Sequence, residues 1–203
     1  MSYNDIVLVV PTVEIEKLID LKEGLIELKP SDIRIVIDEY GDFMLREKAE
    51  KDEEFRQVIP YVLMENVNRE YLLLKRLVTQ GESRLHNKYS LGIGGHVEIE
   101  DRVNEGRLWD TFLTGMRREI EEEVDVDFLQ TPRFIGLINN TAEEVGRVHI
   151  GLFYMVKIKF NFLREMDKFE CSWESIESLG KYEHSMEGWS KIVLNYLIKQ
   201  TIA

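Results

Sequence analysis

The stretch from Leu108 to Val124 constrains the fold most, because it has the pattern of an amphipathic helix. At 3.6 residues per turn its apolar residues fall on one broad face, which predicts packing against a sheet. Three glutamates of the same stretch lie at i, i+3 and i+4, so their carboxylates converge near the edge of that face. The apolar residues are Leu108, Trp109, Phe112, Leu113, Met116, Ile120 and Val124, and the glutamates are Glu119, Glu122 and Glu123.

Clustered carboxylates repel one another, which disfavours their ionised forms unless a cation lies among them. Oxygen ligands of this kind suit a hard divalent ion such as Mg²⁺ or Mn²⁺. A solvated acidic helix is the alternative for any Glu-Glu-Glu run. The metal site is favoured here because the carboxylates border the packed face, Arg118 precedes them, and a Gly94-Gly95 turn lies upstream.

This combination resembles the Nudix family of pyrophosphohydrolases. The family's box reads Gly, five residues, Glu, seven residues, then Arg-Glu-apolar-x-Glu-Glu-x-Gly-apolar. Residues 118–126 match the second half, and Gly95 matches the opening glycine. Asp125 replaces the family's second glycine, so we expect a different turn after the helix.

The spacing of the box is stretched. Gly95 to Arg118 is 23 positions (118 minus 95), where the family pattern gives 14, so nine residues (23 minus 14) are inserted. We place this insertion near Ile99–Arg107. Counting back eight from Arg118 then makes Asp110 the acid in place of the family's first Glu.

The resemblance implies roles for the motif residues. Glu119, Glu122 and Glu123 would hold Mg²⁺ (or Mn²⁺), which lowers the pKa of a bound water and neutralises the pyrophosphate. Arg118 would have a structural role, pairing with an acid to brace the loop, and Asp110 is the candidate for that acid.

The remaining candidate residues lie in the loops. Gly94, Gly95 and Glu98 are expected to contact the substrate, since glycine lets the backbone approach a ligand closely. The general base is left open between a glutamate of the helix, Glu98, and Glu143 or Glu144 of the later loop.

The fold implied by the resemblance is α/β (α+β type), a Nudix-like α/β/α sandwich with a mixed β-sheet. Residues 1–55 would be an N-terminal extension packing on a Nudix-like domain of residues 56–203. Apolar patterns predict strands over 6–10, 58–67, 71–76, 134–139 and 148–159 and a closing helix over 189–198.

Two N-terminal segments are ambiguous. Ser31-Asp32 after Pro30 could cap a helix that runs to Tyr40, whereas the alternation of Ile33, Ile35 and Ile37 favours a strand. We predict the helix because of this candidate cap. The charge run over 46–54 is expected to be a solvated loop, with a cover for the active site or a partner subunit as the alternative.

Composition limits the partners. A net charge of −12 disfavours nucleic acid and anionic membranes, and no stretch approaches a membrane span. Cys171 is the only cysteine, which fits a reducing, cytoplasmic location.

None of the four histidines pairs with another at zinc-ligand spacing, and His149 is expected to be a core or sheet-face residue. A homodimer is an expectation from the resemblance alone.

The predicted function is Mg²⁺/Mn²⁺-dependent cleavage of a pyrophosphate bond in a nucleoside-diphosphate-linked or similar phosphorylated small molecule. The alternative is a catalytically silent module of the same fold that senses a ligand or binds a protein, for which Asp125 and the insertion leave room. An isoprenoid diphosphate isomerase would need a cysteine near the Gly-Gly turn, and none is present there. The substrate, the general base and the role of residues 1–55 are not determined at this level.

Overall fold

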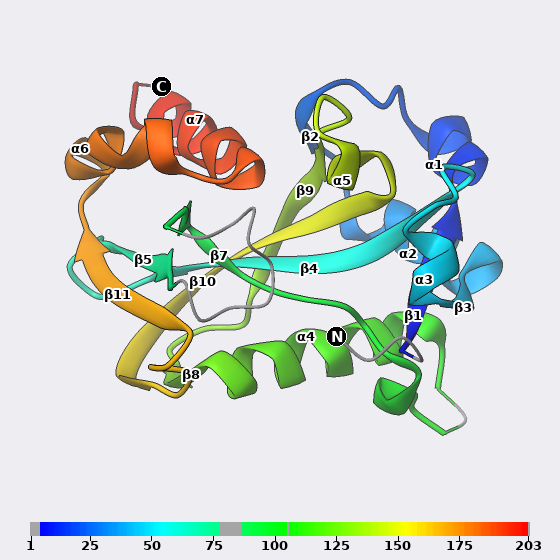
Figure 1. The fold of residues 1–203 in the computed structure, drawn as a ribbon, viewed down its shortest axis with the longest axis horizontal. Helices are drawn as coiled ribbons and strands as arrows, with labels where there is room; N and C mark the ends of the chain where they lie inside the picture. Colours follow the sequence, from blue (N-terminus) through cyan, green and yellow to red (C-terminus); the bar gives the residue numbers. More distant parts are fainter. Residues whose placement is uncertain (1–4, 78–86, 105, 203) are drawn as a thin grey trace. The chain divides into compact units, whose positions relative to one another are not determined.

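The structure is a computed structural model that describes residues 5–77, 87–104 and 106–202, drawn as a ribbon in Figure 1. The chain forms two compact units. The first unit comprises Met1–Tyr61, Gly94–Glu119 and Phe134–Phe153, and the second comprises Val62–Ile93, Ile120–Arg133 and Tyr154–Ala203. Residues of the N-terminal extension therefore group with the Gly94-Gly95 stretch and most of the motif helix.

The first unit is built around β1 (Ile6–Pro11), whose residues 7–10 are almost fully buried, as expected for a strand covered on both faces. It pairs antiparallel with β3 (Asp42–Leu45) and with the start of β4 (Phe55–Glu65). The Leu8 N–H also donates to the Val97 carbonyl at 2.8 Å, so the first strand supports the segment that follows the Gly-Gly turn. A second antiparallel pair joins β2 (Gly24–Glu27) to β9 (Arg133–Asn139).

The helices of this unit include two of the segments discussed above. α2 (Pro30–Tyr40) confirms the helix prediction: Ile33 and Ile37, one turn apart, are fully buried while Ile35 is exposed. The solvated-loop prediction is wrong for the start of the charge run, because α3 (Arg46–Ala49) is a helical turn that buries Ala49 against β1. The remaining short helices are α1 (Thr12–Leu18), η2 (Ile99–Asp101) and α5 (Glu144–Arg147).

The predicted motif helix is α4 (Leu108–Glu123), a continuous helix whose first twelve residues, 108–119, belong to the first unit. Its first turn is stabilised by Asp38, whose Oδ1 accepts the Trp109 N–H at 2.8 Å, since a carboxylate satisfies a free N–H at a helix start. The predicted apolar face is wrong at Leu113, which is 36% exposed. The buried members of that face are Trp109, Phe112, Met116, Ile120 and Val124.

The second unit carries β5 (Tyr71–Arg76), which pairs antiparallel with β11 (Phe169–Glu174) and β6 (Tyr89–Ser90). β7 (Gly92–Ile93) pairs with the end of β4, and β8 (Val124–Phe128) pairs with the end of β10 (His149–Leu163). Three helical segments follow β11. They are α6 (Ile176–Leu179), η3 (Gly180–Ser185) and α7 (Gly188–Ile202).

Asp125 takes the place of a turn glycine because α4 leads directly into β8, so the backbone at this position is extended. Its carboxylate accepts from the Asn161 side chain at 2.8 Å and pairs with Arg164. The chain therefore has no glycine turn at this position. Asp125 is instead a strand residue, and side chains at the end of β10 hold its carboxylate.

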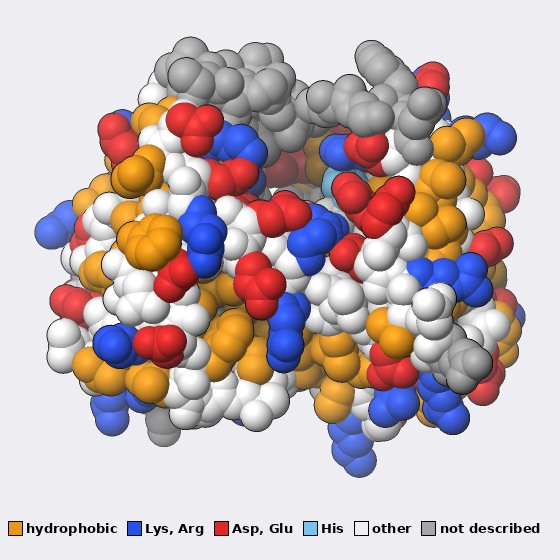
Figure 2. Space-filling view, turned by 90° about the horizontal axis from the view of Figure 1, so that it is seen from below, with side chains coloured by type: hydrophobic (Ala, Val, Ile, Leu, Met, Phe, Trp, Pro, Cys, Tyr) orange, Lys and Arg blue, Asp and Glu red, His pale blue; other side chains and the backbone are white. Residues whose placement is uncertain are grey.

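The predicted α/β class with a mixed sheet is confirmed, and strands 58–67, 71–76, 134–139 and 148–159 correspond to β4, β5, β9 and β10. On the face drawn in Figure 2, acidic and basic side chains are interspersed. No helix in the described ranges has the length and apolar character needed to cross a membrane.

Candidate active site

The segment after the Gly-Gly turn is fixed by a capping box. The Glu98 N–H donates to Asp101 Oδ2 at 2.8 Å, and the Glu98 side chain accepts from the Asp101 backbone in return. Asp101 is 5% exposed. Burial raises the pKa of Glu98 above its ordinary value, since desolvation disfavours the ionised carboxylate. Glu98, expected to contact substrate, is thus a partly buried acid engaged in the box.

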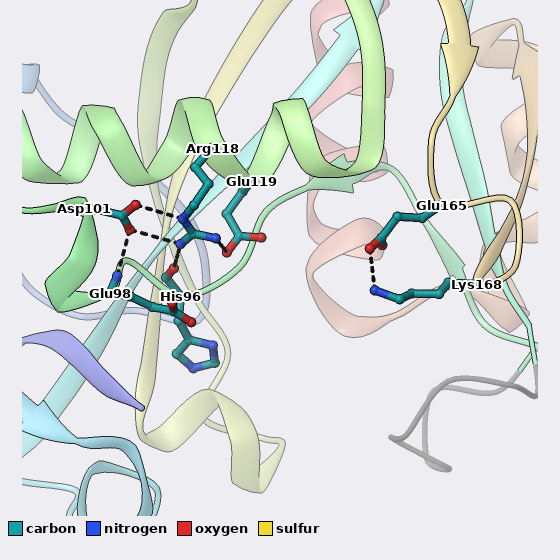
Figure 3. A network of polar contacts seen from close by, with 7 residues as sticks. All are labelled: His96, Glu98, Asp101, Arg118, Glu119, Glu165 and Lys168. Atoms are coloured by element: carbon teal, nitrogen blue, oxygen red, sulfur yellow. Dashed lines mark hydrogen bonds and ion pairs between the residues drawn. The ribbon is translucent and has the colours of Figure 1, made fainter. Parts of the chain in front are cut away.

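Arg118 joins α4 to this segment, as Figure 3 shows. Its Nε donates to Asp101 Oδ1 at 2.8 Å and its Nη2 to Asp101 Oδ2 at 3.0 Å, a bidentate pair. Nη2 also donates to the His96 carbonyl at 2.8 Å, and Nη1 donates to Glu119 Oε1 at 2.9 Å. The guanidinium therefore braces the turn, the η2 segment and the first motif glutamate together. The Glu165–Lys168 pair in the same figure belongs to the second unit.

The acid that pairs with Arg118 is Asp101, so the prediction of Asp110 is wrong. The Asp110 carboxylate instead accepts the Arg107 N–H at 3.1 Å at the start of α4. Counting forward from Gly95, Asp101 occupies the position of the family's first Glu after five residues. The nine extra residues therefore lie between Asp101 and Arg118, not before Asp101.

Gly95 and Glu119 are brought into direct contact. A β-carbon on Gly95 would overlap the Glu119 carboxylate, and one on Gly94 would overlap the Pro60 carbonyl oxygen. Gly94 therefore requires glycine, because backbone fills the space of a side chain, whereas a side chain at position 95 would force the Glu119 carboxylate to move. The Gly-Gly turn and the first glutamate of the trio, 24 positions apart (119 minus 95), lie side by side.

Gly115 is a further packing residue of α4. Its β-carbon would lie 2.7 Å from Asp101 Oδ2 and 3.1 Å from the Val97 methyl groups. Because Gly115 has no side chain, the segment that carries Val97 and Asp101 can pack directly against the helix.

The other predicted residues are located as follows. Glu122 and Glu123 continue α4 after Glu119; Glu122 is exposed and Glu123 is half-buried, like Glu119. Glu143 and Glu144 are exposed at the start of α5.

Sequence reasoning missed a histidine pair. His96 and His149, 53 positions apart, meet with their Nε2 atoms 3.3 Å from each other. The pKa of His96 lies well below its ordinary value, first because of burial and then because of the nearby charges of Arg46, His149 and Arg118. No short histidine spacing signals this pair, because β10 and the Gly-Gly turn meet only in the folded chain.

Comparisons with known proteins agree with these features. No family model matches the chain. Over 162 residues the chain is 35% identical to Protein YmaB of Bacillus subtilis (strain 168), covering 76% of this chain and 77% of that protein. It is 39% identical to Tm1382, whose crystal structure was described as that of a candidate Nudix hydrolase, with a TM-score of 0.85 over 96% of this chain and 99% of that one.

A more distant structure shares the fold. DR0079 from Deinococcus radiodurans is 16% identical, with a TM-score of 0.53 over 86% of this chain and 98% of that chain. The 96% coverage by Tm1382 includes most of the first 55 residues, so the N-terminal segment is common to both proteins.

An α/β fold in which an Arg-Glu-x-x-Glu-Glu helix packs on a Gly-Gly turn defines a Nudix-type protein. The chain belongs to the Nudix hydrolase family. It is accordingly a pyrophosphohydrolase of the Nudix type.

Proposed function

We propose that this protein hydrolyses a pyrophosphate bond in a nucleoside-diphosphate-linked or similar phosphorylated small molecule. The reaction would depend on Mg²⁺ or Mn²⁺ held by Glu119, Glu122 and Glu123. The observation that carries the proposal is the contact of Glu119 with Gly95, which puts the first carboxylate of the trio beside a backbone turn free of side chains.

The donor set fits such an ion. All three groups are carboxylates, the ligand type that hard divalent cations prefer. They lie at i, i+3 and i+4 on one continuous helix, so each can direct oxygens to the same side. When bound, the ion would neutralise the phosphates and lower the pKa of a water molecule.

The chain's own residues orient and support this site. Arg118 fixes Glu119 through Oε1, and it is itself held by the buried Asp101. Gly94 and Gly95 let the backbone turn pass close to Pro60 and to the Glu119 carboxylate, which keeps the first glutamate beside the turn. Among the proposed bases, Glu98 has a raised pKa, which brings a carboxylate closer to the value that suits proton transfer at neutral pH.

The test replaces both Glu122 and Glu123 by Gln, with Glu121→Gln as the matched control. Glu121 is exposed on the same helix and lies outside the i, i+3, i+4 set. Nucleotide sugars, dinucleotides, capped RNA and modified triphosphates are assayed for phosphate-bond cleavage with Mg²⁺ and with Mn²⁺. We expect the double variant to lose at least about 100-fold in kcat, as for removal of a principal electrostatic group, and the control to keep its rate.

Retention of near wild-type turnover by the folded double variant would overturn the ligand assignment. Tight binding of one compound without any turnover would favour the sensing module instead. In the same assay, single Gln variants of Glu98, Glu143 and Glu144 identify the base by which one loses kcat.

A further inference from the structure

The histidine pair has the geometry of two ligands to one metal ion. His96 follows the Gly-Gly turn and His149 opens β10. Their Nε2 atoms are 3.3 Å apart, with the two rings edge to face at 67°. Two nitrogens bound tetrahedrally to one zinc at ~2.0–2.1 Å lie roughly 3.3–3.4 Å apart, so the two Nε2 atoms are already at a separation that one ion can bridge.

The protonation of His149 is set by a backbone contact. Its Nδ1 lies 2.7 Å from the Val145 carbonyl oxygen, which can only accept a hydrogen bond, so Nδ1 carries the proton. In the neutral ring Nε2 then presents its lone pair toward His96. A carbonyl that fixes the second nitrogen in this way is the usual support of a metal-binding histidine.

A carboxylate completes the group. Ligand atoms of Glu50, His96 and His149 all lie within 4.8 Å of one another. Glu50 directly follows α3 and its Oε1 accepts from Arg46 Nε at 3.3 Å. This ion pair is partly exposed, so it is weak and competes little with a metal ion for the carboxylate.

We propose that Glu50, His96 and His149 bind a divalent transition-metal ion of the zinc type, at a site separate from the glutamate trio of α4. Two imidazoles with one carboxylate suit zinc and its neighbours, whereas Mg²⁺ prefers an all-oxygen shell. Three protein ligands leave a fourth position open to water or another ligand.

The surroundings of the pair favour the neutral form of the His96 ring. Burial and the charges of Arg46 and Arg118 keep the His96 ring neutral at pH 7, because they hold its pKa well below the ordinary value. With Nε2 of His149 as the acceptor, His96 Nε2–H is the donor between the rings; for both Nε2 atoms to bind an ion, the His96 proton would have to move to Nδ1, which keeps the ring neutral. Figure 3 shows the His96 ring directed away from the Arg118 guanidinium.

The first experiment is imidazole ¹⁵N–¹H NMR of the chelator-treated full chain titrated with Zn²⁺. The protein has four histidines, and the other two are His86, outside the described residues, and the exposed His184. We expect the Nε2 signals of His96 and His149 to shift together at one equivalent. Shifts confined to His86 or His184, or no shifts, would overturn the proposal.

The second experiment tests the carboxylate by Zn²⁺ calorimetry. Glu50→Gln should weaken binding by about 10–100-fold or more, the range seen when even indirect supports of a metal are removed. Glu47→Gln is the matched control, because Glu47 is an exposed acid of α3 that pairs with Lys51. Equal affinities for both variants would overturn the three-ligand site.

Independence from the α4 glutamates is checked with the Glu122→Gln/Glu123→Gln protein. We expect it to bind Zn²⁺ with unchanged affinity at His96 and His149. Loss of the two histidine shifts in this folded variant would overturn the claim of a separate site, whatever its effect on hydrolysis.

Discussion

Replacing Asp101 by Asn tests the bracing of the motif helix. The side chain of Asp101 is 3% exposed, and its two oxygens accept from Arg118 Nε, Arg118 Nη2 and the Glu98 N–H. Asn keeps the shape but removes the charge and turns one acceptor into a donor that faces these donors. The substitution therefore leaves the Arg118 cation without its buried partner.

The expected cost follows from burial. Breaking a buried ion pair by removing one partner costs roughly 3–5 kcal/mol. Arg118 is 28% exposed, so water offsets part of this loss. We expect the free energy of unfolding to fall by about 2–4 kcal/mol, a large fraction of a typical ~5–15 kcal/mol total.

The assay is urea unfolding followed by tryptophan fluorescence and circular dichroism, with coincident transitions required. Asp110→Asn is the control, because an Asn oxygen still accepts the Arg107 N–H; its cost should stay below about 1 kcal/mol. The reasoning is refuted if Asp101→Asn lies within about 1 kcal/mol of the wild type, or if Asp110→Asn is the more destabilising change.

Two further predictions follow from the same unit. Gly95→Ala should lower kcat by about 10–100-fold, because the new methyl group displaces the Glu119 carboxylate. Gly180→Ala is the control, since a β-carbon there meets nothing within 4 Å, and it should leave kcat unchanged in the same kinetic assay. Folding lowers the pKa of His96, so below pH ~6.5 the unfolded chain takes up a proton that the folded chain does not. The free energy of unfolding of the wild type should therefore fall by up to about 1.4 kcal/mol for each pH unit below that value. His96→Gln should show a smaller loss between pH 6.5 and 5, and parallel curves for the two proteins in urea titrations would contradict this.

Much of the local structure was readable from the sequence because it depends on periodicity. The apolar period predicted α4 from Leu108. The helix prediction for α2 is confirmed, but the expected cap is wrong: the N-cap is Lys29, without a side-chain hydrogen bond, and Ser31 and Asp32 lie within the first turn after Pro30. Leu113 was predicted to be buried but is exposed. A helical wheel gives the direction of each side chain, but it does not show how far neighbouring segments extend over that side of the helix. The homodimer, the cytoplasmic location and the boundary after residue 55 stay predictions.

The sequence by itself determined the family motif and the helix that carries Glu119, Glu122 and Glu123, because helical geometry relates residues a few positions apart. Only the tertiary structure decided that Arg118 binds Asp101 and that His96 meets His149, at separations of 17 and 53 residues. Such pairings depend on which strands and loops pack together, and spacing in the chain carries no record of that packing.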